Sequence, residues 1–221
     1  MPVALALVAM AHGAWGDGYR NPPPTAEGIG KSGANMVFVD DASAISYNPA
    51  NLAFQTNVSI VLDLTLAQSE NTFDNSVSGQ AVSDDPWVAL PNLYVSVPVG
   101  ESFVLGLGVT TPFGQGIEFN KEDLVNIPAF TSGWPPAIHE AEIGLVNFNP
   151  TVAFRIGDRV SVGVGADIYY STLEFKQFYP WGQLAPPGVL TNGNAEADSD
   201  GYGFGGNAAI TWRLPRGNSF R

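Results

Sequence analysis

The sequence predicts an all-β protein, a transmembrane antiparallel β-barrel, on three observations. Segments of about ten residues alternate apolar with small or polar side chains, and about ten residues let a tilted strand cross the hydrocarbon core of a bilayer. The alternation has a period of two, which sends successive side chains to opposite faces of a sheet. The links between the segments are alternately long and short. Membrane-spanning barrels have tight turns at one rim and long loops at the other.

Six segments are the predicted strands. Their alternating positions fall within 58–66, 93–97, 103–109, 146–156, 160–170 and 202–212. The opposite faces of these segments carry Gly106, Gly108, Asn147, Thr151, Gly163, Gly165, Asp167 and Asn207. This contrast indicates an outer face in lipid and an inner face that is wet or tightly filled. A secreted β-sandwich binding module also alternates, but its solvent face carries Lys, Glu and Thr rather than repeated glycine.

The links give the orientation of the strands. The tight turns are Gly100-Glu101, Gly157-Asp158 and Pro215-Arg216-Gly217-Asn218. The long links are residues 68–87, 112–140 and 176–200, which exceed ordinary hairpin loops. We therefore expect the long links on the external surface and the tight turns on the internal one.

Composition limits the classes of function. The chain has 221 residues, a net charge of -12 and no cysteine, which excludes disulfides and thiol chemistry. Nine basic residues against 21 acidic ones do not suit nucleic-acid binding, because phosphate contacts need Lys and Arg. His139 lies beside Glu140 and Glu142, but one histidine with adjacent acids makes no catalytic triad. We predict no enzyme activity, no catalytic residue, no metal site and no cofactor.

Three parts are expected along the chain. Residues 1–16 have the apolar core of a signal peptide, although no basic residue precedes it. Residues 17–56 are not strand-like and are expected to fold back as a partly helical hatch, or plug. Residues 57–221 form the N-terminal part of the barrel. The chain stops where a seventh strand would begin, and six strands do not close an ordinary barrel, so we expect this part to be truncated.

Several motifs then resemble the FadL/TodX-type family of outer-membrane transporters, also called OmpP1/FadL. They are Gly30-Lys31-Ser32-Gly33-Ala34, Val39-Asp40-Asp41-Ala42-Ser43-Ala44, Asn48-Pro49-Ala50, Pro91-Asn92-Leu93-Tyr94, Thr111-Pro112-Phe113-Gly114 and Asn147 to Arg155. The resemblance implies a fourteen-stranded monomeric barrel with an N-terminal hatch in the bacterial outer membrane, of which this chain supplies about six strands. It also implies passive, ligand-gated uptake of long-chain fatty acids or other hydrophobic small molecules. The expected partners are such a ligand and outer-membrane lipid.

The resemblance assigns roles to two motifs. In the family, ligand leaves sideways where the third strand kinks, which places a lateral opening at Thr111, Pro112, Phe113 and Gly114. Proline cannot donate to a sheet ladder and glycine marks bends, so a break here is physically reasonable. The alternative is that Pro112 simply ends the strand. Asn48, Pro49 and Ala50 would gate from the hatch, with the Asn48 amide bridging to the kinked strand. The alternative for this motif is a turn that ends a helix.

The long links also contain apolar residues, which commonly mark binding surfaces. The predicted groove for a hydrophobic ligand consists of Ile127, Phe130, Trp134, Phe178, Trp181 and Leu184. Alternatively, these loops cover the barrel mouth and bury their own aromatic rings. A non-transporting adhesion or structural barrel would have the same strands, but it would need neither a groove nor a kink.

Overall fold

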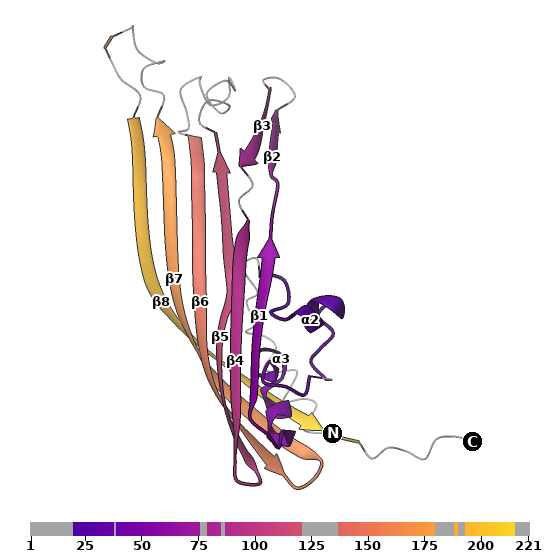
Figure 1. Ribbon diagram of the computed structural model, residues 1–221. Coiled ribbons are helices and arrows are strands. Elements are labelled where there is room, and N and C mark those ends of the chain that lie inside the picture. Colours follow the sequence, from indigo (N-terminus) through magenta and orange to yellow (C-terminus); the bar gives the residue numbers. More distant parts are fainter. Residues whose placement is uncertain are drawn as a thin grey trace, which may run out of the picture.

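The computed structural model describes residues 20–37, 39–75, 79–84, 87–120, 137–179, 188–189 and 193–214. Six long strands lie side by side in one curved antiparallel sheet, in the order β1-β4-β5-β6-β7-β8 (Figure 1). The strands are β1 (Ser59–Ala67), β2 (Thr72–Asn75), β3 (Gly79–Asp84), β4 (Val88–Val99), β5 (Phe103–Phe119), β6 (Ala137–Ile156), β7 (Val160–Tyr179) and β8 (Gly193–Trp212). The helices are α2 (Ala26–Gly30), α3 (Ala44–Tyr47) and the 3-10 helix η2 (Pro49–Phe54). The predicted antiparallel β fold is confirmed.

Two tight turns join the strands at the lower rim in Figure 1. Gly100 and Gly157 have φ angles of 71° and 64°, in the left-handed region that glycine adopts without a steric penalty. These are the turns that the sequence predicts between β4 and β5 and between β6 and β7. The third predicted turn, residues 215–218, and the predicted signal peptide, residues 1–16, lie outside the described residues.

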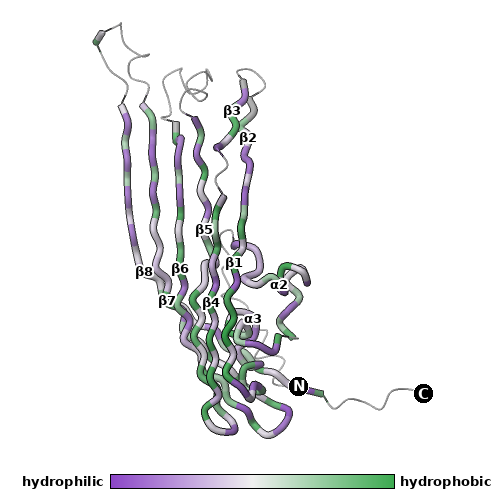
Figure 2. The backbone as a smooth tube through the Cα atoms, viewed as in Figure 1, coloured by the Kyte–Doolittle hydropathy of each residue, from purple (hydrophilic) through white to green (hydrophobic). Residues whose placement is uncertain are grey.

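The strands extend further toward the upper rim than the sequence pattern predicts. The first long link contains the β2–β3 hairpin, and the other two links are shortened because β5 continues to Phe119, β6 begins at Ala137 and β7 continues to Tyr179. Polar residues become frequent in these upper parts (Figure 2). The contrast between the two faces fades there, so the hydropathy pattern ends before the backbone pairing does.

The outer face of the sheet exposes apolar side chains. Ile60, Leu62 and Leu64 of β1 are exposed by 68%, 75% and 62%, and Val164 of β7 by 56%. Asp167, on the opposite face of β7, is only 8% exposed. No second layer of described residues packs on the apolar face, which excludes the β-sandwich. None of the helices in the described ranges combines the length and the apolar composition that crossing a membrane would require.

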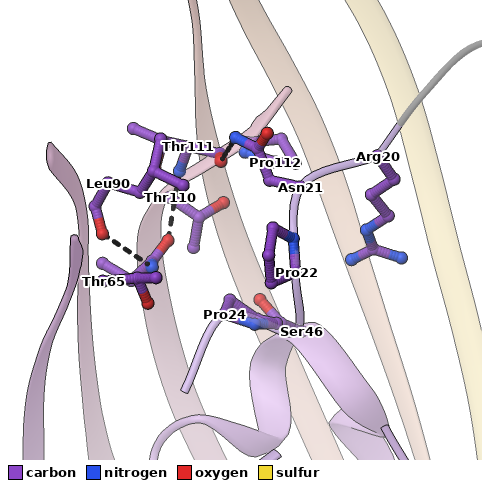
Figure 3. Close-up of a pocket in the computed structure, with 11 residues that line it drawn as sticks. Arg20, Asn21, Pro22, Pro24, Ser46, Thr65, Leu90, Thr110, Thr111 and Pro112 are labelled. Atoms are coloured by element: carbon purple, nitrogen blue, oxygen red, sulfur yellow. Dashed lines mark hydrogen bonds between the residues drawn. The ribbon is translucent and has the colours of Figure 1, made fainter. Parts of the chain in front are cut away.

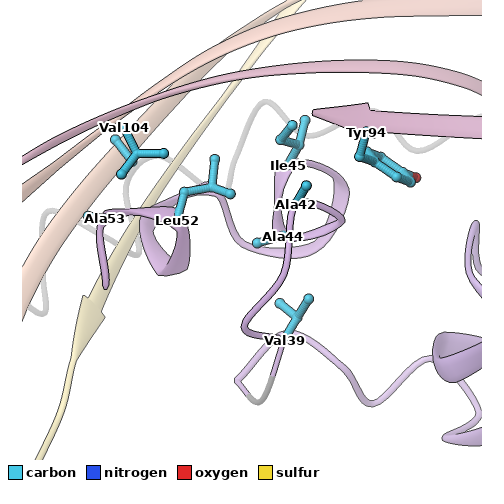
Figure 4. Close-up of a cluster of buried hydrophobic side chains, with 9 residues drawn as sticks. Val39, Ala42, Ala44, Ile45, Leu52, Ala53, Tyr94 and Val104 are labelled. Atoms are coloured by element: carbon cyan, nitrogen blue, oxygen red, sulfur yellow. The ribbon is translucent and has the colours of Figure 1, made fainter. Parts of the chain in front are cut away.

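The inner face of the sheet packs against residues 20–56, which we call the hatch segment. Ile45, Leu52 and Ala50 of this segment are buried, and Ile45 and Leu52 belong to one apolar cluster with Tyr94 of β4 (Figure 4). The backbone of the hatch segment comes closest to the sheet at Gly163 of β7. A Cβ atom there would lie 2.4 Å from the carbonyl carbon of Pro49. The hatch segment therefore packs directly against the small residues of the inner face.

Candidate functional site

The third long strand, β5, is interrupted at its middle. Its pairing with β6 shifts between Thr110, opposite Asn147, and Phe113, opposite Leu145. Thr111 and Pro112 therefore stand opposite a single β6 residue, which is a β-bulge. Proline has no N–H to donate to the ladder, so a bulge suits it. Because β5 continues to Phe119, the alternative that Pro112 ends the strand is wrong.

The wall opens beside this bulge. The ladder between β4 and β5 ends at the pair Leu93 and Val109. Along the same edge, β5 pairs again only at Glu118 and Phe119, with the end of β3. Between these points β4 is paired with β1 alone. The gap holds a cavity of about 240 Å³. Its lining includes Asn21, Pro22, Ala67, Gln68, Val88, Leu90, Gly114, Gln115 and Gly116. We call this gap the wall opening.

Asn21, at the start of the hatch segment, reaches into the wall opening. Its backbone N–H donates to the Pro112 carbonyl and its side-chain amide to the Thr111 carbonyl, both at 2.9 Å. Figure 3 shows Asn21 against these two residues, with Arg20 turned away from them. From the other side, the Thr111 N–H donates to Oδ1 of Asn92, at 3.1 Å. Asn21 and Asn92 thus satisfy backbone groups that the bulge leaves without a strand partner.

Replacing Asn21 with alanine is expected to loosen the bulge. The variant loses one amide hydrogen bond and leaves the Thr111 carbonyl without that donor, which costs about 1–2 kcal/mol. Amide hydrogen exchange of residues 110–116 is expected to accelerate about 5- to 30-fold. The matched control is Asn57→Ala, since Asn57 is exposed and bonds only to its neighbour Thr56 in the described structure. Equal exchange rates in the two variants would remove Asn21 from this role.

The Asn48-Pro49-Ala50 motif joins the hatch segment to the far part of the sheet. Asn48 ends α3 and begins η2, where its Oδ1 accepts from the Ala50 N–H at 3.2 Å. Its Nδ2 donates to the Met36 carbonyl and to Oγ1 of Thr211 in β8, each at 3.1 Å. The expected bridge from the Asn48 amide to the kinked strand is therefore wrong. The backbone of β5 at the bulge is already bonded to Asn21 and Asn92, and Asn48 faces β8 instead.

A second contact ties the same motif to β7. Ser161 Oγ donates to the Ala50 carbonyl at 2.7 Å. Within the hatch segment, the hydroxyl of Tyr47, which precedes the motif, lies 3.0 Å from that of Thr25 near the start of the segment. Burial raises the pKa of Tyr47, which therefore stays neutral at physiological pH.

Two charged groups also contact the hatch segment. Oδ1 of Asp63 in β1 accepts from the Ala26 N–H at 2.9 Å, and the Arg213 guanidinium lies 3.6 Å from the centre of the Phe54 ring.

A second cavity, of about 300 Å³, lies inside the sheet between the hatch segment and the bulge. We call it the lumen pocket. Ile45, Tyr47 and Pro49 line it from the hatch segment, and Pro112 and Phe113 line it from the bulge. A polar wall completes it on the inner face of β6, β7 and β8. That wall consists of Asn147, Asn149, Asp167 and Asn207.

The structure brings some predicted residues together and separates others. Pro112 and Phe113 line the lumen pocket and Gly114 lines the wall opening, so the Thr111-to-Gly114 motif lies between the two cavities. Phe178 lies in β7 rather than in a loop. The other predicted groove residues, Ile127, Phe130, Trp134, Trp181 and Leu184, lie outside the described residues. The sequence analysis did not identify Asn21, nor the polar wall as a cluster of residues. The run of prolines that follows Asn21 is the sequence signal that could have pointed to Asn21.

Comparison with known proteins identifies the family to which this fold belongs. The family model described as "Outer membrane protein transport protein (OMPP1/FadL/TodX)" matches residues 7–219. The chain belongs to this family. Its members are outer-membrane transport channels rather than enzymes, so the predicted family and outer-membrane location are confirmed.

Individual relatives agree with the family. A long-chain fatty acid transport protein of Escherichia coli O6:H1 is 26% identical over 247 aligned positions, covering 99% of this chain and 51% of the relative. Outer membrane protein P1 of Haemophilus influenzae is 23% identical over 79% of this chain and 40% of its own length. The chain thus spans about half the length of the curated relatives or less.

Solved structures share the fold. A FadL homologue of Pseudomonas aeruginosa superimposes with a TM-score of 0.62 at 18% identity, over 90% of this chain and 50% of the homologue. The toluene transporter TodX of P. putida gives 0.59 at 18% identity, over 79% and 48%. The curved sheet is therefore the barrel wall of FadL/TodX-family proteins.

Proposed function

We propose that the protein containing this chain takes up long-chain fatty acids or other hydrophobic small molecules passively across the outer membrane. In this proposal ligand is captured at the external loops, enters the lumen pocket and leaves sideways through the wall opening. The relatives named as transporters of fatty acids and toluene support the substrate class. The protein acts as a monomer, with the hatch segment as its plug.

The observation that carries the lateral exit is the interrupted ladder at the bulge. A continuous wall would leave no path for an apolar molecule from the lumen into the bilayer. Here two cavities lie on either side of the Thr111-to-Gly114 motif, with Asn21 between β4 and β5. An adhesion or structural barrel needs neither the gap nor the pocket.

A hydrophobic ligand needs few polar contacts to bind to the external loops. Burial of each CH₂ group contributes about 0.8 kcal/mol, so half of a long acyl chain in an apolar groove gives usable affinity. The groove remains the set Ile127, Phe130, Trp134, Phe178, Trp181 and Leu184, of which Phe178 stands at the upper end of β7.

The direct test is uptake of labelled ligand. Cells lacking their own hydrophobic-compound channel, with and without this protein, are supplied with radiolabelled oleate or toluene. Saturable uptake that depends on the protein, without an energy source across the outer membrane, is expected. Uptake equal to that of the empty cells for both compounds would leave the structural barrel as the better proposal.

Replacing Asn48 with alanine is expected to uncouple the hatch segment from β8. The variant loses the cap at η2 and the hydrogen bond to Thr211, at a cost of about 1 kcal/mol for the cap alone. Because gating requires a defined hatch position, we expect uptake to fall about fivefold, the factor that corresponds to this energy. Asn57→Ala is the control. Unchanged uptake by Asn48→Ala would count against a gating role.

A further inference from the structure

The polar wall of the lumen pocket is built around one carboxylate. Oδ1 of Asp167 accepts hydrogen bonds from the side-chain amides of Asn147, at 2.8 Å, and Asn149, at 2.5 Å. Oδ2 accepts from the amide of Asn207, at 3.3 Å. These residues come from three neighbouring strands, and Asp167 is only 8% exposed. The carboxylate is therefore fixed in place on the pocket wall.

Among the described residues, no cation forms an ion pair with Asp167. The ion pairs among the described residues involve Lys31 and Lys176, and neither includes Asp167. Arg20 lines the same pocket, but it is exposed and does not pair with Asp167. Amide donors stabilise a carboxylate without neutralising it, so this wall presents a negative charge to the pocket.

The amides around Asp167 leave acceptors unfilled. Each turns its NH₂ toward the carboxylate, and Oδ1 of Asn147 and Oδ1 of Asn207 then accept no hydrogen bond from any described residue, although both atoms are buried. Asn147 is only 7% exposed. Buried acceptors without a donor are costly, and the missing donor is often water or an unseen ligand.

One of these two oxygens, Oδ1 of Asn207, lies over a glycine. A Cβ atom on Gly165 would lie 2.7 Å from Oδ1 of Asn149 and 2.8 Å from both Oδ1 of Asn207 and Oγ1 of Thr151. The Thr151 hydroxyl donates to Oδ1 of Asn149 at 2.5 Å, so the unfilled acceptor above Gly165 is Oδ1 of Asn207. On the other sides of the pocket, Ile45, Pro49 and Phe113 suit hydrocarbon, beside the hydroxyl-bearing residues Ser46, Tyr47 and Thr110.

We propose that Asp167 and its asparagine amides make the lumen pocket selective for hydrophobic molecules whose polar end donates hydrogen bonds or carries positive charge. Alcohols, phenols and protonated amines fit this wall, whereas a carboxylate meets a like charge and finds acceptors where it needs donors. This inference rests on the proposed function, since it ranks ligands within the hydrophobic class that the protein would transport.

The test compares three probes with the same alkyl chain: decylamine, decanol and decanoate. Binding to the protein in detergent is measured by competition against a fluorescent hydrophobic dye at pH 7.5. Asp167→Asn keeps the side-chain volume and removes the charge. Asp200→Asn, on the exposed outer face of β8, makes the same change in net charge and is the matched control. Arg20→Gln tests the cation in the pocket.

We expect decylamine and decanol to bind more tightly than decanoate, with decylamine at least about tenfold ahead. In Asp167→Asn the preference for the amine is expected to be lost and decanoate binding to improve, with no change in Asp200→Asn. Equal binding of all three probes, as when water alone fills the acceptors, would overturn the inference. So would tighter binding of decanoate that Arg20→Gln abolishes. In both cases the proposed function survives. If no probe displaces the dye at all, both proposals fail.

Discussion

Gly163→Val is expected to displace the hatch segment from the barrel wall. The new Cβ would lie 2.4 Å from the Pro49 carbonyl carbon and 2.5 Å from the Ala50 nitrogen. Both are backbone atoms, so no side-chain rotation relieves the overlap. Overpacking of this kind costs about 1–3 kcal/mol. Ser161 and Thr211 then lose their contacts with the hatch segment as well, because both contacts need the hatch segment in its packed position.

The measurements are ion conductance in planar bilayers and proteolysis of the hatch segment. We expect higher conductance and faster cleavage within residues 20–56, with an intact barrel by circular dichroism. Gly201→Ala is the control, since a Cβ there would meet only Ser171 Oγ, at 3.9 Å. If the valine variant does not fold, Gly163→Ala offers a milder version of the same clash. A seated, protected hatch in both Gly163 variants would contradict the packing described here.

Gly114→Trp is expected to block the wall opening while leaving the fold intact. A Cβ at Gly114 would lie 3.5 Å from the Ile143 carbonyl oxygen and 3.7 Å from Nδ2 of Asn21, which are ordinary contacts. The indole ring would then occupy the gap between β4 and β5. If ligand leaves by this route, uptake is expected to fall at least about tenfold, equivalent to about 1.4 kcal/mol on the barrier to passage.

Two further measurements test whether Gly114→Trp lowers uptake by blocking the wall opening. Ala166→Trp places the same bulk on the outer face of β7, away from the opening, and is expected to transport normally. Dye binding to the lumen pocket is expected to be unchanged in Gly114→Trp, because the pocket lies on the other side of the bulge. Normal uptake by Gly114→Trp would rule out lateral exit here and would favour a path along the barrel axis.

The sequence predicted the lower part of the barrel well, for a physical reason. Where the outer face meets lipid, only apolar residues are tolerated, so positions such as Ile60, Leu62 and Val164 alternate strictly with their inner neighbours. Above that zone both faces meet water. Residues such as Glu140 and Lys176 then carry no periodic signal, although their strands remain paired and the two side chains form an ion pair at 2.8 Å.

The sequence predicted the part of the functional site that depends on the backbone properties of single residues. Pro112 followed by Gly114 signals a disturbed strand, because one cannot donate a hydrogen bond and the other bends easily. The partners of the disturbed backbone were not predictable, since Asn21 lies 90 residues from Thr111 in the sequence. The same applies to Asp167, because the convergence of Asn147, Asn149 and Asn207 on it depends on strand register.

The contacts of Asn48 also bear on the order of assembly. The amide of this residue bonds to Thr211, 163 positions later in the chain, and Ala50 accepts a bond from Ser161, 111 positions later. Contacts between such distant residues form slowly, because a long loop must close first. The hatch segment precedes the strands in the chain but can reach its final position only after β7 and β8 have paired. Until then its contacts with Ser161 and Thr211 are missing, so a chain that ends before β7 is expected to leave this segment open to proteolysis.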